Sequence, residues 1–273
     1  MASFIGKENV TGMQTLKPHL SIVIPAYNEA DRIGKTLEGT FAYLDSQSYD
    51  SEVIVVNDGS RDKTADEVLK FEGRGAGRLR LLHNPGNRGK GYSVRHGMLQ
   101  AKGDIALFMD ADLATPIGEV PKVIEPIEEN LYDVVFGSRA LDRSLIGKRQ
   151  SSIRETIGRT GNWIQWALTG LDFKDTQCGF KAFRREAAQR AFAIQQIDGF
   201  GFDPEILFIA KRQGCRLLET PVRWNHVEGS KVNPYTAPLK VLTEVATIRW
   251  HALTGRYDEA SAVNALNSTP ETK

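Results

Sequence analysis

Short runs of apolar, mostly β-branched residues alternate with amphipathic segments along the first half of the chain. The runs predict five strands, at 20–25, 52–57, 79–83, 104–109 and 133–138. The segments between them predict helices at about 30–46, 62–72, 91–101 and 118–130, with Asn28 or Asp31 as the cap of the first. Strands without polar alternation, separated by helices, are typical of a mostly parallel sheet with helices on both faces. The fold class is therefore predicted to be α/β and Rossmann-like.

The pattern changes after residue 140. A basic segment at 143–159 leads into a helix that contains Trp163 and Trp166, and a helix at 203–213 and a strand near 217–224 follow. No linker separates these elements from the first half. We therefore expect one domain over 19–257, with a first half at about 19–140 and a second half at about 141–257. Residues 1–18 are expected to form a flexible arm, and 258–273 a disordered tail.

Polar clusters follow the predicted strands at the points where they end. In open α/β sheets, ligands bind beyond the carboxyl ends of the strands. Five such clusters in register exceed what loop composition alone would give, and they predict a single site. The clusters are Asn28-Glu29, Asp58-Gly59-Ser60, Asn87-Arg88-Gly89-Lys90, Asp110-Ala111-Asp112 and Ser138-Arg139.

Asp110 and Asp112 flank one alanine at the end of an apolar strand. In an extended segment, residues two apart point to the same side, so both carboxylates can reach one cation. Mg²⁺ and Mn²⁺ prefer oxygen ligands and often join one or two carboxylates to substrate phosphates. An isolated Asp-x-Asp is more often a solvated loop, but its place at the end of a buried strand favours a metal site here.

The clusters around Asp58 and Lys90 indicate a phosphorylated ligand with a base or ribose. A carboxylate at Asp58 can accept hydrogen bonds from such groups, although Asp-Gly alone usually marks only a turn. Asn87 to Gly91 opens a helix, and a helix N-terminus favours anions. The Walker A spacing is absent, and the first strand does not lead into Gly-x-Gly-x-x-Gly, which argues against a dinucleotide dehydrogenase.

Composition limits the classes of partner and compartment. The formal net charge is +1, so no global attraction to nucleic acid is expected. Two isolated cysteines, Cys178 and Cys215, favour a reducing compartment. No run of about 18 apolar residues is present, so no transmembrane helix is expected. These features predict a cytoplasmic location and leave the oligomeric state open.

Three motifs in order resemble the family 2 glycosyltransferases of GT-A fold: Ile22 to Glu29, Val55 to Ser60 and Asp110 to Asp112. Within that family the chain is most similar to the dolichyl-phosphate glucosyltransferase and mannosyltransferase branch, over about residues 20–256. Later motifs are closer to the glucosyl type; they are 87–91, 137–140, 175–181, 202–205 and 228–231. The resemblance implies an inverting transferase that moves a hexose, glucose from UDP-glucose, to a polyprenyl or dolichyl phosphate. It also implies that the first half, about 19–140, binds the donor and the second half, about 141–257, binds the acceptor.

The resemblance also implies roles for single residues. Asp112 would bind Mg²⁺ or Mn²⁺, and Asp110 would face the donor and contribute to the metal site. One position departs from the mannosyl pattern, because the place of a third metal ligand is held by Ala114, so that Thr115 or water would have to substitute. The remaining implied roles are donor contacts for Pro25, Tyr27, Glu29, Asp58 and Lys90, and acceptor-phosphate contacts for Arg139, Arg154 and Lys231.

Two alternative functions stay open from the sequence. A family 2 transferase acting on a soluble or polysaccharide hydroxyl would need a general base, for which Asp203 is the candidate. Asp203 could equally be a helix N-cap before Pro204, and the two roles are compatible. A non-catalytic protein that binds a nucleotide sugar is the other alternative, weakened by the presence of both Asp110 and Asp112.

The basic segment 143–159 and its tryptophans have two interpretations. Ile153, Ile157, Ile164 and Leu168 follow helical spacing, which fits an amphipathic helix against the core. Tryptophan and cations also favour a membrane interface, where a polyprenyl acceptor would be met. We expect peripheral contact with the cytoplasmic face of a membrane.

Overall fold

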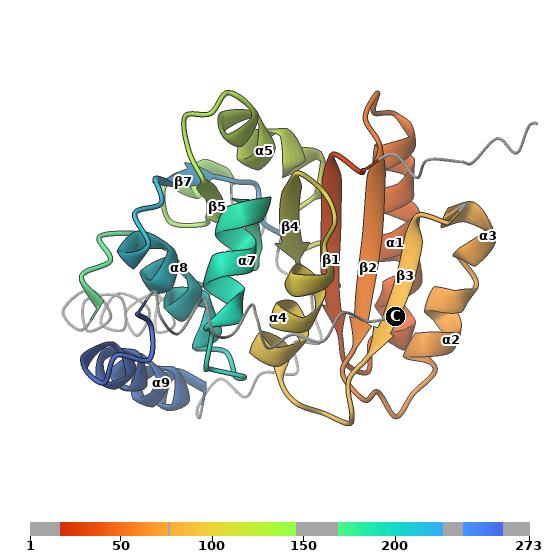
Figure 1. The fold of residues 1–273 in the computed structure, drawn as a ribbon. Coiled ribbons are helices and arrows are strands. Elements are labelled where there is room, and N and C mark those ends of the chain that lie inside the picture. Colours follow the sequence, from red (N-terminus) through yellow and green to blue (C-terminus); the bar gives the residue numbers. More distant parts are fainter. Residues whose placement is uncertain (1–16, 76, 146–168, 226–236, 259–273) are drawn as a thin grey trace, which may run out of the picture.

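The computed structural model describes residues 17–75, 77–145, 169–225 and 237–258. A seven-stranded sheet in the order β3-β2-β1-β4-β6-β5-β7 runs through the molecule (Figure 1). Strand pairs β1–β2, β1–β4, β2–β3 and β5–β7 are parallel, and β6 is antiparallel to both β4 and β5. The strands are β1 Leu20–Ala26, β2 Ser51–Asn57, β3 Leu79–His83, β4 Ile105–Met109, β5 Val134–Ser138, β6 Phe180–Arg184 and β7 Leu217–Pro221.

Helices lie on both faces of the sheet, as predicted (Figure 1). Within the described residues, no helix is long and apolar enough to cross a membrane. The helical elements are α1 Ala30–Asp45, α2 Thr64–Leu69, α3 Glu72–Gly75, α4 Lys90–Gln100, η1 Ile117–Glu119, α5 Val120–Glu128, η2 Arg143–Leu145, α7 Arg185–Ala193, α8 Phe202–Arg212 and α9 Ala237–Leu253.

Alternate side chains of the central strands enter two separate cores, because successive residues of a strand point to opposite faces. Val23 and Phe108 face the core formed with α4, α7, α8 and α9. Ile22 and Leu107 face the core formed with α1 and α5. This explains the unbroken apolar runs in the sequence: both faces of each central strand are covered.

The five predicted strands of the first half are confirmed, and several details differ. Neither β6 nor α7 was predicted from the sequence, and the helix expected at 62–72 is divided into α2 and α3. The strand expected at 217–224 ends at Pro221. Neither Asn28 nor Asp31 caps α1; the N-cap is Glu29, without a side-chain cap bond. Asn28 adopts a left-handed φ of 54°, and its side-chain oxygen accepts a hydrogen bond from the Arg61 amide at 2.7 Å.

The direction of β6 brings a distant segment to the carboxyl ends of the parallel strands. Because β6 runs antiparallel to β4, its first residue, Phe180, pairs with the last residue of β4, Met109. The residues before β6 therefore lie beside those that follow β4. The Asp110 amide donates to the Gly179 carbonyl at 3.1 Å, which joins the two segments directly.

Candidate functional site

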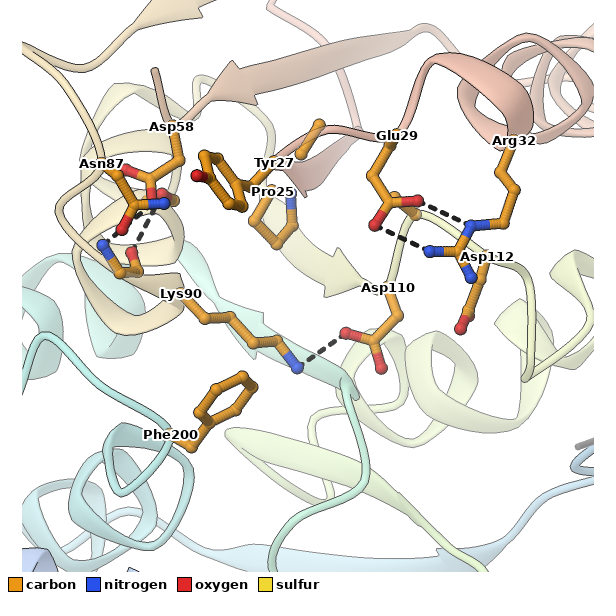
Figure 2. A pocket seen from close by; sticks show the side chains of 14 residues that line it. Pro25, Tyr27, Glu29, Arg32, Asp58, Asn87, Lys90, Asp110, Asp112 and Phe200 are labelled. Atoms are coloured by element: carbon orange, nitrogen blue, oxygen red, sulfur yellow. Dashed lines mark hydrogen bonds and ion pairs between the residues drawn. The ribbon is translucent and has the colours of Figure 1, made fainter. Parts of the chain in front are cut away.

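A pocket of about 410 Å³ opens at the carboxyl ends of β1, β2 and β4. It gathers every residue for which the sequence implied donor or metal contact. Figure 2 shows their side chains around one cavity. The predicted residues in the lining are Pro25, Tyr27, Glu29, Asp58, Lys90, Asp110 and Asp112. Their individual roles stay predictions, but their convergence is a structural fact.

Lys90 and Asp110 face each other across this pocket (Figure 2), with Lys90 Nζ 2.6 Å from Asp110 Oδ1. Burial acts to lower the pKa of Lys90, but the charges of Asp110 and then Asp203 outweigh it and raise the pKa. Burial, followed by the charge of Asp110, raises the pKa of Asp112. Negative charge is therefore in excess where the two aspartates meet, which is the electrostatic setting that a cation would relieve.

Gly179 leaves room for the Asp110 carboxylate. A Cβ added at Gly179 would lie 2.2 Å from Asp110 Oδ2. The sequence singled out the motif 175–181 without giving Gly179 a role. A glycine before an unrecognised antiparallel strand offers no local signal, because its function arises from the neighbouring strand.

Glu29 and Arg32 form a two-pronged ion pair at the start of α1, next to Asp112 (Figure 2). Arg32 Nε and Nη2 donate to the two Glu29 carboxylate oxygens at 2.7 and 3.0 Å. Arg32 also lines the pocket and acts to lower the pKa of Asp112. Arg32 was not predicted from the sequence, although its spacing of three residues from Glu29 at the start of a helix was an available signal.

Asp58 organises the loop that leads into α4. Its Oδ1 accepts hydrogen bonds from the Asn84 side chain at 2.8 Å and the Arg88 amide at 2.9 Å, and its Oδ2 accepts from the Gly89 amide at 2.8 Å. Asp58 is 3% exposed yet still reaches the pocket lining. The carboxylate thus fixes the approach to Lys90, and donor contact by its remaining lone pair stays a prediction.

The start of α4 is also held from the opposite side, by segment 197–199. The Gly91 amide donates to the Asp198 carbonyl at 2.8 Å. A Cβ on Gly91 would lie 2.5 Å from the Ile197 carbonyl oxygen, so a glycine is required for this close approach. Lys90 therefore starts from a backbone that is fixed on both sides. Phe200, 40% exposed, follows this segment and lines the pocket, which the sequence did not indicate.

Asp203 does not occupy the place expected of a base or of a cap. The N-cap of α8 is Gly201, so the cap interpretation is wrong. Asp203 is 2% exposed, its carboxylate forms an ion pair with Lys181, and it is absent from the pocket lining. A carboxylate that is buried and does not line the pocket has no access to a substrate hydroxyl there, which argues against the proton-accepting role assigned to Asp203 from the sequence.

Arg139 forms a forked ion pair with Asp175 at the end of β5. Its Nε and Nη2 donate to the two Asp175 oxygens at 2.6 and 2.8 Å. A guanidinium has five N–H donors, so this pair leaves others for an anion. Arg154 and Lys231, together with Trp163 and Trp166, fall outside the described residues, as do most of the predicted arm and tail.

Comparison with known sequences gives a consistent family. The model of the family described as glycosyl transferase family 2 matches residues 21–192. A dolichyl-phosphate beta-glucosyltransferase of Trichomonas vaginalis is 39% identical over 224 residues, covering 78% of this chain and 68% of that protein. Those of Dictyostelium discoideum and Homo sapiens are 35% and 34% identical; each alignment covers 87% of this chain, and 76% and 77% of the relatives.

Solved structures confirm the predicted GT-A fold. Glucosyl-3-phosphoglycerate synthase from Mycobacterium tuberculosis, in complex with Mn²⁺, UDP-glucose and phosphoglyceric acid, superposes with a TM-score of 0.61 at 18% identity, covering 85% of this chain and 80% of that one. At this identity the likeness concerns the fold alone. The sequence match extends over more than half of the chain, and the chain therefore belongs to glycosyl transferase family 2.

Proposed function

We propose that the protein transfers glucose from UDP-glucose to dolichyl phosphate, with inversion at the anomeric carbon. The observation that supports this most directly is the pocket in which Lys90, Asp110 and Asp112 meet at the carboxyl edge of the sheet. One cation and two acids suit a diphosphate bridged by a metal ion. The choice of glucose and dolichyl phosphate is supported by the relatives, which match over most of the chain.

Mg²⁺ or Mn²⁺ is the proposed cofactor, held by Asp112 with Asp110. The site fits such an ion, because burial and the neighbouring carboxylate leave Asp112 short of compensating positive charge. Ala114 is 7% exposed and offers no ligand, and in the part of the chain that the structure describes no group of three or more His, Cys, Asp or Glu residues gathers. Phosphate oxygens and water would complete the shell. The ion would stabilise charge on the departing diphosphate.

The acceptor phosphate is proposed to meet Arg139, joined by Arg154 and Lys231. Arg139 suits this role because its guanidinium is held by Asp175 while part of it stays accessible, with 33% of its side chain exposed. A phosphate oxygen is already anionic at neutral pH, so it needs positioning and charge screening more than a base. Asp203, the candidate base for a sugar hydroxyl, is buried, which favours a phosphate acceptor over a sugar hydroxyl.

Contact with the cytoplasmic face of a membrane is proposed for delivery of the lipid acceptor. The end of α9 supports this proposal within the described residues. Trp250 and Leu253 are 62% and 68% exposed, and Arg249 and Arg256 are exposed beside them. Tryptophan with cations is favoured at a membrane interface.

A transfer assay tests the proposed function. The protein is incubated with Mg²⁺ or Mn²⁺, dolichyl phosphate and a panel of labelled nucleotide sugars, and lipid products are extracted into organic solvent. We expect label from UDP-glucose in the organic phase, and none with Asp112→Ala. Label that stays in the aqueous phase with every donor would refute the lipid acceptor.

A further inference from the structure

Phe200 brings an exposed aromatic ring to the pocket and is not among the predicted donor contacts. In the part of the chain that the structure describes, the exposed large apolar side chains are Leu69, Leu131, Phe200, Trp250 and Leu253. Of these, Phe200 is the one that lines the pocket. An aromatic ring in contact with water is unfavourable, and pockets for small molecules use such rings as walls that bury the ligand. The position of Phe200 therefore indicates a ligand contact.

The segment that carries Phe200, residues 195–201, is held by neighbouring helices. Asp198 of this segment forms an ion pair with Arg95 of α4 at 3.0 Å. Glu205 of α8 accepts hydrogen bonds at 2.9 and 3.0 Å from two consecutive amides earlier in the segment. A side chain contributes most to a binding site when the backbone that carries it is fixed by such contacts. Phe200 therefore has a defined place at the pocket.

Glu244 of α9 adds a further support at the two glycines that flank Phe200. Its carboxylate accepts a hydrogen bond from the Gly201 amide at 2.5 Å. A Cβ on Gly199 would lie 2.2 Å from Glu244 Oε1, and a Cβ on Gly201 would lie 2.4 Å from Glu244 Cβ. Both glycines are thus needed for this close approach. A residue of α9 therefore sets where the backbone of Phe200 lies.

The order of the residues across the pocket indicates which part of the donor would meet Phe200. In Figure 2 the Lys90–Asp110 pair separates Phe200 from the predicted nucleoside contacts. Those contacts are Pro25 and Tyr27. A nucleotide sugar has its parts in the same order, with the diphosphate between the nucleoside and the hexose. When the diphosphate lies at Lys90 and the nucleoside beyond it, the hexose comes to Phe200.

We propose that the ring of Phe200 packs against the hexose of the nucleotide sugar, and that Glu244 is the residue that positions it. A hexose in its chair form presents a face of C–H bonds, which can cover an aromatic ring. This inference rests on the proposed function, since it concerns the donor of that reaction. Because UDP lacks the hexose, Phe200 should add affinity for UDP-glucose and none for UDP.

Titration calorimetry on the full chain with Mn²⁺, using UDP-glucose and UDP as separate probes, tests the contact. We expect Phe200→Ala to weaken UDP-glucose binding about tenfold, the scale of one aromatic contact, with UDP binding unchanged. Phe200→Tyr keeps the ring and should bind UDP-glucose like the wild type. Leu131→Ala, at a side chain 54% exposed outside the pocket lining, is the control and should change neither affinity. Equal losses for the two probes in Phe200→Ala, or no loss for either, would overturn the proposal.

The positioning role of Glu244 is tested with the same two probes. Glu244→Ala removes the acceptor of the Gly201 amide and should weaken UDP-glucose binding about fivefold, the scale of one hydrogen bond, with UDP binding unchanged. Glu244→Gln keeps an oxygen that can accept this bond and should restore the affinity for UDP-glucose. Equal losses for the two probes in Glu244→Ala would show a general effect on the fold and overturn the positioning role, as would an unchanged affinity for UDP-glucose.

A contact between Phe200 and the lipid acceptor would give a different result. Phe200→Ala would then leave the affinity for UDP-glucose unchanged and raise the KM for dolichyl phosphate in the transfer assay. This outcome would overturn the hexose contact.

The failure of the proposed function is distinguishable from the failure of this inference. A wild-type chain that binds neither UDP-glucose nor UDP with Mn²⁺ would overturn both. A wild-type chain that transfers glucose to dolichyl phosphate, together with a Phe200→Ala variant of unchanged affinity for UDP-glucose, would overturn the hexose contact alone. A chain that binds UDP-glucose through Phe200 but transfers nothing to the lipid would refute the proposed acceptor and support the hexose contact.

Discussion

Lys90 Nζ lies 2.6 Å from Asp110 Oδ1, so a cation of the chain itself neutralises one of the two acids proposed to hold a metal. The other acid, Asp112, is left in a buried setting that raises its pKa. An incoming cation and Lys90 therefore compete for Asp110, whereas an incoming diphosphate attracts both. This relationship connects the proposed metal site with the proposed donor site.

Lys90→Met should change metal and nucleotide binding in opposite directions. Without the ammonium, Asp110 is available to Mn²⁺, so the affinity for Mn²⁺ alone should rise. The affinity for UDP should fall about tenfold or more because a charged donor is lost. Titration calorimetry with each ligand separately measures both, and a parallel fall in the two affinities would contradict the competition.

Asp112→Asn should abolish Mn²⁺-dependent UDP binding while the protein stays folded. The substitution removes a partly buried charge that Asp110 destabilises, so Tm should stay the same or rise. Asp45→Asn, at the far end of α1 and 47% exposed, is the control for a lost carboxylate outside the pocket. Metal-dependent binding that survives in Asp112→Asn would refute the metal assignment.

Gly179→Ala should disturb the site without touching a ligand. The new Cβ would meet the Asp110 carboxylate at 2.2 Å, and this side chain must move away. We expect weaker UDP and Mn²⁺ binding, by about tenfold, with a loss of stability of about 1 kcal/mol, typical of a point substitution. Calorimetry and urea unfolding give the two quantities; a large loss of stability with intact binding would show that the strain is relieved elsewhere.

Arg139→Gln should destabilise the fold by about 2 kcal/mol, because it leaves the buried Asp175 carboxylate without its forked partner. This loss is smaller than that expected for a fully buried pair, because the Arg139 side chain is one-third exposed. Arg139→Lys should restore only part of the loss, since an ammonium cannot form the fork. Arg139→Gln/Asp175→Asn should be more stable than the sum of the single changes. Strict additivity in urea unfolding would argue against a coupled pair.

Glu205 should give the fold a dependence on pH between about 5 and 8. Burial raises the pKa of Glu205 to about 7, against opposing hydrogen bonds from Tyr257 and from the amides of Gln196 and Ile197. A carboxyl with a raised folded pKa binds its proton more tightly when folded. Its stabilisation is therefore complete below the unfolded value of 4.5 and is lost as pH rises through 7.

The measurement compares wild type with Glu205→Gln in urea unfolding at several pH values. The stability of the wild type relative to the variant should fall by on the order of 3 kcal/mol from pH 5 to pH 8. Glu119→Gln is the control, because cationic partners lower the pKa of Glu119 and place its transition at more acidic pH. An unchanged difference across this range would mean that Glu205 is already ionised at pH 5.

Local sequence was enough for the strands of the first half and for the positions of Asp110 and Asp112. Unbroken apolar runs followed by polar clusters describe covered parallel strands and their carboxyl ends, and both are properties of neighbouring residues. Local sequence was not enough to predict β6. Its residues Phe180–Arg184 include Lys181, and a charged residue in such a run indicates a surface position; only the structure shows that Lys181 is paired with Asp203. The assignment of Asp203 as a cap was wrong for the same reason, whereas its role as a base stays a prediction.

The sequence by itself determined a mostly parallel α/β sheet, the acidic residues at the carboxyl ends of its strands, and the family to which the chain belongs. Only the tertiary structure decided that β6 runs antiparallel, that Gly179 makes room for Asp110, that Lys90 pairs with Asp110, and that Lys181 pairs with Asp203. The physical reason is that strand direction and ion pairing join residues tens of positions apart. Such contacts leave no periodicity in the chain, whereas the alternation of strand and helix does.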